Sequence, residues 1–245
     1  MRLANYKTNN PVFSGFFWDD PKTSDQKMTV LGIFLKSIFC LLIIAGITAY
    51  IWKLSKDGTS VKWFTLGGML GAIVISIIIS VRQHWASFLV PLYTIAKGFF
   101  LGGFSAFAHN NYPELPYQAI GVTIVTFFIM LILYQTRIIV VTKKLKAVII
   151  TAAASIFVVY LISMILGIFG IKSFLLGTSW IAIVFTCIAA IVASFTLLLD
   201  FDYIERHKDR APKSKEWIAT WGLLASLIWL YVETLRLLQK LAIRF

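Results

Sequence analysis

Charged residues, cysteines and histidines are all scarce in this chain of 245 residues. Only 14% of the residues are charged, whereas 59% are hydrophobic. A typical soluble domain has roughly 25% charged residues, so a soluble fold of this length could not bury so much apolar surface. The two cysteines, Cys40 and Cys187, both fall within apolar stretches. Their number and position exclude the disulfide framework of a small secreted domain.

Enzyme signatures are also missing from the sequence. It contains no HExxH, no GxSxG, no phosphate-binding P-loop and no Cys/His cluster at the spacing of metal ligands. The three histidines, His84, His109 and His207, fall in predicted loops or interfaces. We therefore expect a protein that is not an enzyme and that has no resident cofactor or metal.

Long apolar runs dominate the rest of the sequence. Each run reaches the ~20 residues that a helix needs to cross a ~30 Å hydrocarbon core, and none shows the alternation of a strand. The sequence thus predicts an all-α integral membrane protein with an N-terminal arm, 1–27, and a seven-helix domain, 28–245. The seven expected spans are about 29–52, 63–81, 86–108, 117–139, 147–168, 175–201 and 217–241.

The excess of positive charge, formally +12, lies mostly in the short segments between these spans. With the N-terminus inside, inner segments carry fourteen Lys and Arg residues and outer segments carry seven. This asymmetry predicts a cytoplasmic N-terminus and contact with the lipid bilayer, and it argues against nucleic acid as a partner. The polar N-terminus lacks the apolar core of a cleavable signal. We expect a multi-pass protein of the inner (plasma) membrane, of undetermined oligomeric state.

Three charged residues fall deep within expected spans: Lys97, Asp200 and Glu233. An acid at mid-span costs about 2.5–3.5 kcal/mol on insertion scales, so such residues usually bind an ion or a partner charge. Lys97 is eleven residues from either end of its span, and Glu233 is its first candidate partner, with Asp200 second. Glu233 can also pair within its own helix with Arg236, three residues further on.

The last span carries a polar stripe at steps of three and four residues, which places the stripe on one face of a helix. Such a helix is expected at the centre of a bundle. The stripe consists of Gly222, Ser226, Trp229, Glu233, Arg236 and Lys240.

The acids at the end of the sixth span differ in their expected surroundings. Asp202 precedes Arg206 by four residues, and with Glu205 it is typical of a solvated helix end, whereas Asp200 points about 200° away from Asp202. Counted from the connector, Asp200 and Glu233 differ in depth by ~10 Å. The two acids therefore pair only if a helix tilts or the connector unwinds. Otherwise Glu233 pairs with Lys97.

Small residues in the third span indicate a close helix contact. Gly98 and Gly102 form a small-xxx-small pair, which allows backbones to approach closely in lipid. We interpret this pair as a packing feature.

Four stretches, in this order and placement, resemble the Bax-inhibitor/YccA family of seven-span membrane proteins, and in particular its bacterial YccA-like branch. The stretches are 10–13 (NPVF), 91–105 (PLYTIAKGFFLGGFS), 200–205 (DFDYIE), and 216–217 (EW) leading into 230–238 (LYVETLRLL).

The resemblance implies a bundle whose last helix is surrounded by the first six. It also implies a pH-sensitive cation leak, with transient calcium, gated by acids that match Asp200 and Glu233. Lys97 and Arg236 complete the candidate gate or ion-sensing group, and Asp202 and Glu205 are secondary members. Glu233 stands where the calcium-leak members have aspartate. The alternative that the resemblance implies is a non-conducting regulator of a membrane-bound ATP-dependent protease.

Overall fold

Seven long helices make up the computed structural model, which describes residues 27–171, 175 and 177–244. All seven are long and apolar enough to cross a membrane, so the predicted all-α, seven-span architecture is confirmed. They are α1 (Val30–Lys56), α2 (Lys62–Val81), α3 (Ala86–Asn111), α4 (Leu115–Gln135), α5 (Lys143–Ile168), α6 (Trp180–His207) and α7 (Glu216–Arg244), with short 3-10 turns η2 (Gln83–Trp85) and η4 (Lys213–Lys215).

Helix ends follow local capping and turn chemistry more than hydropathy. The fourth span was expected to reach residue 139, but α4 ends at Gln135 because Arg137 adopts a left-handed backbone with φ 56°. The sixth begins at Trp180, where the Ser179 side chain accepts a hydrogen bond from Ala182 N. It continues to His207, beyond the expected residue 201. Hydropathy finds the apolar part of a helix, while its polar turns depend on local contacts.

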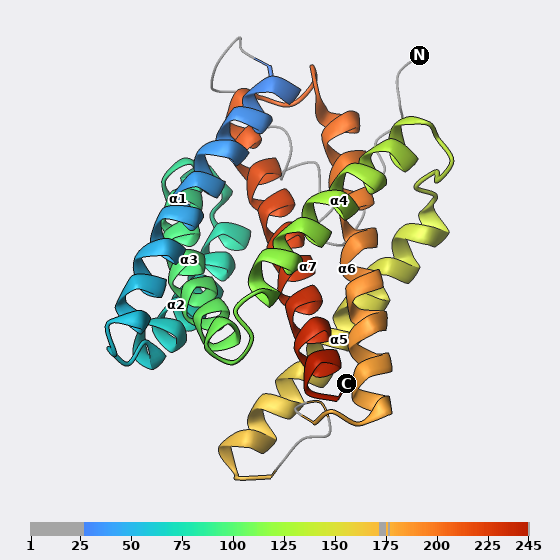
Figure 1. Cartoon of the computed structure of the whole chain (residues 1–245). Coiled ribbons are helices and arrows are strands. Elements are labelled where there is room, and N and C mark those ends of the chain that lie inside the picture. The colour runs from blue at the N-terminus through green and yellow to red at the C-terminus, as the bar shows by residue number, and fades with distance from the viewer. Residues whose placement is uncertain (1–26, 172–174, 176, 245) are drawn as a thin grey trace.

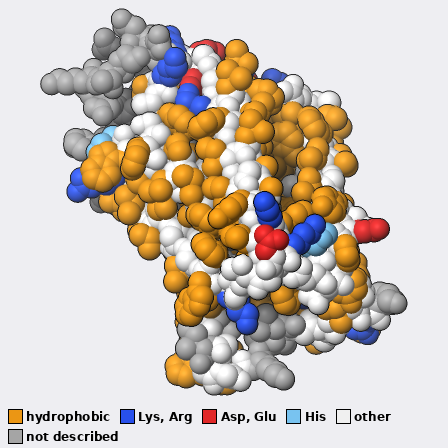
Figure 2. Space-filling view, turned by 60° about the vertical axis from the view of Figure 1, so that its left-hand side comes forward, with side chains coloured by type: hydrophobic (Ala, Val, Ile, Leu, Met, Phe, Trp, Pro, Cys, Tyr) orange, Lys and Arg blue, Asp and Glu red, His pale blue; other side chains and the backbone are white. Residues whose placement is uncertain are grey.

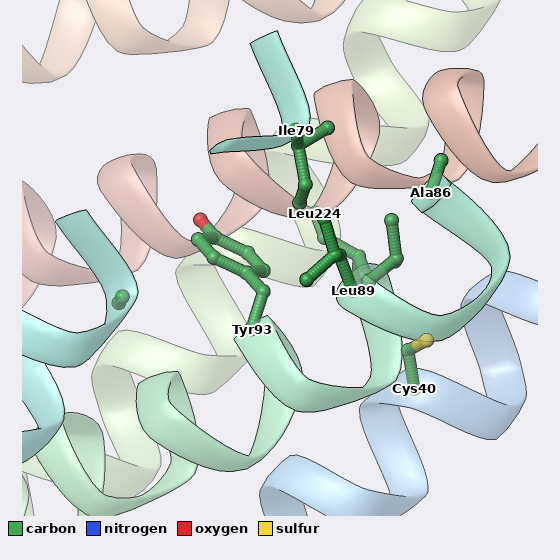
Figure 3. Packing of buried hydrophobic residues seen from close by; sticks show 8 residues of the cluster. Cys40, Ile79, Ala86, Leu89, Tyr93 and Leu224 are labelled. Atoms are coloured by element: carbon green, nitrogen blue, oxygen red, sulfur yellow. The ribbon is translucent and has the colours of Figure 1, made fainter. Parts of the chain in front are cut away.

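The last helix lies at the centre of the bundle, as the sequence predicted. α7 packs against α1, α3, α4 and α6, and Figure 1 shows it passing between α1, α2 and α3 on one side and α5 and α6 on the other. Its apolar side chains pack on both groups, since Leu230 lies in a cluster with Leu197 of α6. Leu224 packs in a cluster with Ile79 and Tyr93, which Figure 3 shows at close range.

Close backbone contact joins α1 to α3. A Cβ added at Gly98 would lie 2.9 Å from Ile47 Cβ, and one added at Gly102 would lie 2.7 Å from Ile51 Cβ. Only glycine leaves room for these side chains of α1. The structure therefore places Gly98 and Gly102 at a packing contact.

Apolar side chains also cover much of the outer surface. The face in Figure 2 is largely hydrophobic, with charged side chains in a few small groups. Large side chains such as Trp63, Phe88 and Phe157 point outward on α2, α3 and α5. A surface of this kind is stable only in contact with lipid, so the bilayer is a partner of this protein.

Candidate gating and ion-sensing site

Glu233 is the most completely bound acid in the middle of the bundle. Its side chain is 1% exposed, and both carboxylate oxygens accept hydrogen bonds. Tyr160 donates its hydroxyl to Oε2 at 2.7 Å, and Trp229 donates Nε1 to Oε1 at 3.1 Å. Arg236 Nη1 lies 3.5 Å from Oε1 and forms an ion pair. Such bonds offset much of the cost of burying the charge.

Two of these partners come from α7 itself, and the third comes from α5. Trp229 precedes Glu233 by one helical turn and Arg236 follows it by three residues, so their side chains reach the same carboxylate. The Arg236 guanidinium also lies over the Tyr160 ring, 4.7 Å from its centroid, and 5.8 Å from that of Phe104. The Glu233 cluster, defined as Tyr160, Trp229, Glu233 and Arg236, thereby ties α5 to α7.

Lys97 shares a cavity with this cluster without pairing with it. The cavity has a volume of about 320 Å³ and lies between α3, α5 and α7. Within the described part of the chain, Lys97 forms no ion pair; its Nζ lies 5.6 Å from the ring centroid of Tyr93 and 5.5 Å from that of Phe100. The expected pairing of Lys97 with Glu233 is therefore replaced by the alternative with Arg236.

Asp200 lies at a different level from Glu233. Its Oδ1 is 3.2 Å from the position of a Cβ at Gly222, and the Ser226 side chain lies beside the carboxylate. Among the described residues, its Oδ2 is shielded from solvent and has no hydrogen-bond partner. Ser226 and Glu233 are seven residues apart on α7, or about 10 Å along the axis. The structure does not bring the two acids together.

Asp202 and Glu205 belong to the polar end of α6. Asp202 pairs with Arg206 at 2.7 Å, and Glu205 pairs with Lys208 at 2.8 Å. Both pairs are local, and most of the groups in them are exposed to solvent. These acids therefore lie at the rim of the bundle and not in its interior.

A second buried acid, Glu216, was not among the predicted site residues. Its side chain is fully buried at the start of α7 and forms an ion pair with Lys36 of α1. The backbone N–H and the hydroxyl of Thr29 both donate to Oε1, at 2.9 and 3.0 Å. A Cβ on Gly32 would collide with this carboxylate. We call this group, Thr29, Gly32, Lys36 and Glu216, the α1–α7 latch.

Backbone bonds extend the latch toward the end of α6. Met28 donates to Ala211 O at 2.8 Å, and Asp209 donates to Met28 O at 3.0 Å. Figure 1 shows the blue start of α1 beside the connector between α6 and α7. The signals for this latch were Glu216-Trp217 in the motif match and a lysine about two turns inside the first span. Tyr160 had a weaker signal, a single phenol in an apolar span.

The functional groups that the site offers are carboxylates, a phenol and cations. Among the residues that the structure describes, no group of three or more His, Cys, Asp or Glu side chains could hold a metal ion. The fold and the buried charges define a multi-pass α-helical membrane protein with charged groups packed around a central last helix.

The comparison with protein families is specific. A family model described as Bax inhibitor 1 like matches residues 10–243, so the chain belongs to this family. The resemblance inferred from the four sequence stretches is thereby confirmed at the level of the family. No curated protein and no solved structure matches the chain.

Proposed function

We propose that this protein is a proton-sensitive cation leak, with calcium as the ion that passes, in which Glu233 stabilises the closed state and Asp200 binds the passing ion. The unequal bonding of the two carboxylates carries the proposal. Glu233 has both oxygens bonded, whereas Oδ2 of Asp200 is shielded from solvent and has no partner among the described residues. A fully bonded carboxylate suits a clamp, and an unsatisfied one suits a proton or a cation.

Protonation of Glu233 would weaken the clamp between α5 and α7. Hydrogen bonds to an ionised acceptor are roughly twice as strong as neutral ones, and Tyr160 and Arg236 both bind this carboxylate. Once Glu233 is neutral, the α5–α7 contact loses part of its stabilisation and the open population grows. Flux should therefore rise as the pH falls.

The ion route that we propose follows the α6–α7 interface and not the cavity beside Glu233. Lys97 and Arg236 both line that cavity, and their positive charges repel a divalent cation in a medium of low dielectric. At Asp200, Gly222 lets the α7 backbone lie close to a carboxylate, and carboxylate oxygens are the ligands that calcium prefers. Asp200 thus supplies the negative charge on the path.

Calcium flux into proteoliposomes containing an indicator dye tests this proposal. We expect Glu233→Gln, which mimics the protonated acid, to raise flux at neutral pH and flatten the pH profile. Asp200→Asn should lower flux at every pH because the passing ion loses its charged ligand. Asp202→Asn is the matched control, since Asp202 is only two residues away and pairs locally with Arg206. Absence of flux at every pH in the unmutated protein would contradict the leak.

The second candidate is a non-conducting regulator of a membrane-bound ATP-dependent protease, acting through the N-terminal arm. Residues 1–26 of this arm lie outside the described residues. What favours the candidate is the backbone bond from Met28 to Ala211, which places the described residue next to the arm beside the α6–α7 connector. Deletion of residues 1–21 should abolish regulation and leave the bundle folded.

We also propose an inner-membrane location with the N-terminus in the cytoplasm, which impermeant thiol labelling of single cysteines would test.

A further inference from the structure

The cavity beside the Glu233 cluster has the volume and length of a small ligand site. Its volume of about 320 Å³ lies within the range of small-molecule sites, roughly 300–1,000 Å³. α7 lines it from Ala225 to Arg236. Eleven residues of helix span about 16 Å, so the cavity has room for an elongated molecule lying along α7.

The lining of the cavity indicates entry from the bilayer. Between its charged groups the wall is apolar and includes Phe100, Ile156, Phe157 and Val232. Phe157 is 64% exposed on α5, a helix that packs mainly against α6 and otherwise faces outward. A molecule that reaches this space from the side therefore passes through hydrocarbon, and it must carry an apolar chain.

The charged side chains that line the cavity carry a net positive charge. Lys97 and Arg236 contribute two positive charges, and Glu233 contributes one negative charge whose oxygens are already bonded. Lys97 has no carboxylate partner in the part of the chain that the structure describes, and only the Tyr93 and Phe100 rings flank its Nζ. A lone cation in a membrane interior is costly unless an anion joins it.

We propose that this cavity binds a single-chain anionic amphiphile, namely a long-chain carboxylate. Its carboxylate pairs with the Lys97 ammonium, and its alkyl chain lies along α7 against Phe100 and Val232. A carboxylate head group is small enough to share a cavity of this size with its own alkyl chain. This binding goes beyond the proposed leak and does not depend on it.

Photolabelling tests the proposal directly. The full-length protein is placed in nanodiscs of neutral phosphatidylcholine at neutral pH, labelled with a diazirine derivative of palmitate, and digested for peptide mapping. We expect label on the cavity-lining parts of α3, α5 and α7. Lys97→Met should reduce labelling roughly tenfold or more, since it removes a charge-assisted bond. Lys146→Met, at an exposed lysine on α5, is the matched control.

Two further arms keep the test decisive. Ala153→Phe fills the cavity while leaving Lys97 in place, and it should also reduce labelling, which covers the case in which Lys97→Met fails to fold. Unlabelled palmitate should compete, whereas methyl palmitate, with the same chain and no charge, should not. Equal competition by the ester, or unchanged labelling in Ala153→Phe, would overturn the proposal. Competition by phosphatidylglycerol but not by palmitate would also overturn it, because the ligand would then be a phospholipid.

Discussion

Replacing Glu216 by glutamine should destabilise the bundle, because it removes the only carboxylate bound to Lys36 in the α1–α7 latch among the described residues. Breaking a buried pair by removing one partner costs about 3–5 kcal/mol. The side chain of Lys36 is 19% exposed and lies over the Trp217 ring, so part of its charge stays stabilised. The amide oxygen of glutamine can still accept from Thr29. We therefore expect the lower end, a loss of about 3 kcal/mol in the free energy of unfolding.

The contact of Glu216 with the beginning of α1 adds to this estimate. Its carboxylate accepts the N–H of Thr29, the N-cap residue of α1, and an anion at a helix N-terminus is stabilised by about 0.3–1 kcal/mol. A neutral side chain loses this contribution as well. The loss should therefore exceed the value for a surface ion pair, which is below about 1 kcal/mol.

Reversible unfolding in mixed micelles of a mild detergent and dodecyl sulfate, followed by far-UV circular dichroism, measures this free energy. Glu205→Gln is the control, because Glu205 forms an exposed ion pair with Lys208. A double-mutant cycle with Lys36→Met should show a coupling of roughly 0.5–3 kcal/mol. A loss below about 1 kcal/mol in Glu216→Gln, or a coupling indistinguishable from zero, would refute the argument from burial and pairing.

Two other substitutions follow from the same geometry and can be measured by the same unfolding assay. Gly102→Ala should cost about 1–3 kcal/mol, because its Cβ would lie 2.7 Å from Ile51 Cβ. Gly121→Ala, on α4 with no neighbouring atom within 4 Å of the new Cβ, should instead gain up to about 1 kcal/mol from helix propensity; equal effects would contradict the close contact. Tyr160→Phe should cost roughly 1.5–3 kcal/mol, because it removes the 2.7 Å bond to the charged Glu233; an unchanged free energy would argue against the clamp.

Local sequence determined the architecture of this protein. Runs of about twenty apolar residues dictate seven membrane helices, because every backbone polar group in a bilayer must be bonded within its own segment. The polar stripe on the last span likewise implied a helix with protein on that side, and α7 is central. Four short stretches were enough to indicate the family, which the match over residues 10–243 confirms.

Only the tertiary structure decided which charged groups meet. The sequence left Glu233 with two possible cationic partners, Lys97 and Arg236. In the structure, the Glu233 oxygens bind Tyr160 of α5, Trp229 and Arg236, and Lys97 faces a cavity. The tertiary structure also pairs Glu216 with Lys36, which is 180 residues away in the chain. Such pairings depend on the rotation and depth of one helix against another, to within a few ångströms. Periodicity places a residue on a face of its own helix, but it contains no information about the neighbour that this face meets.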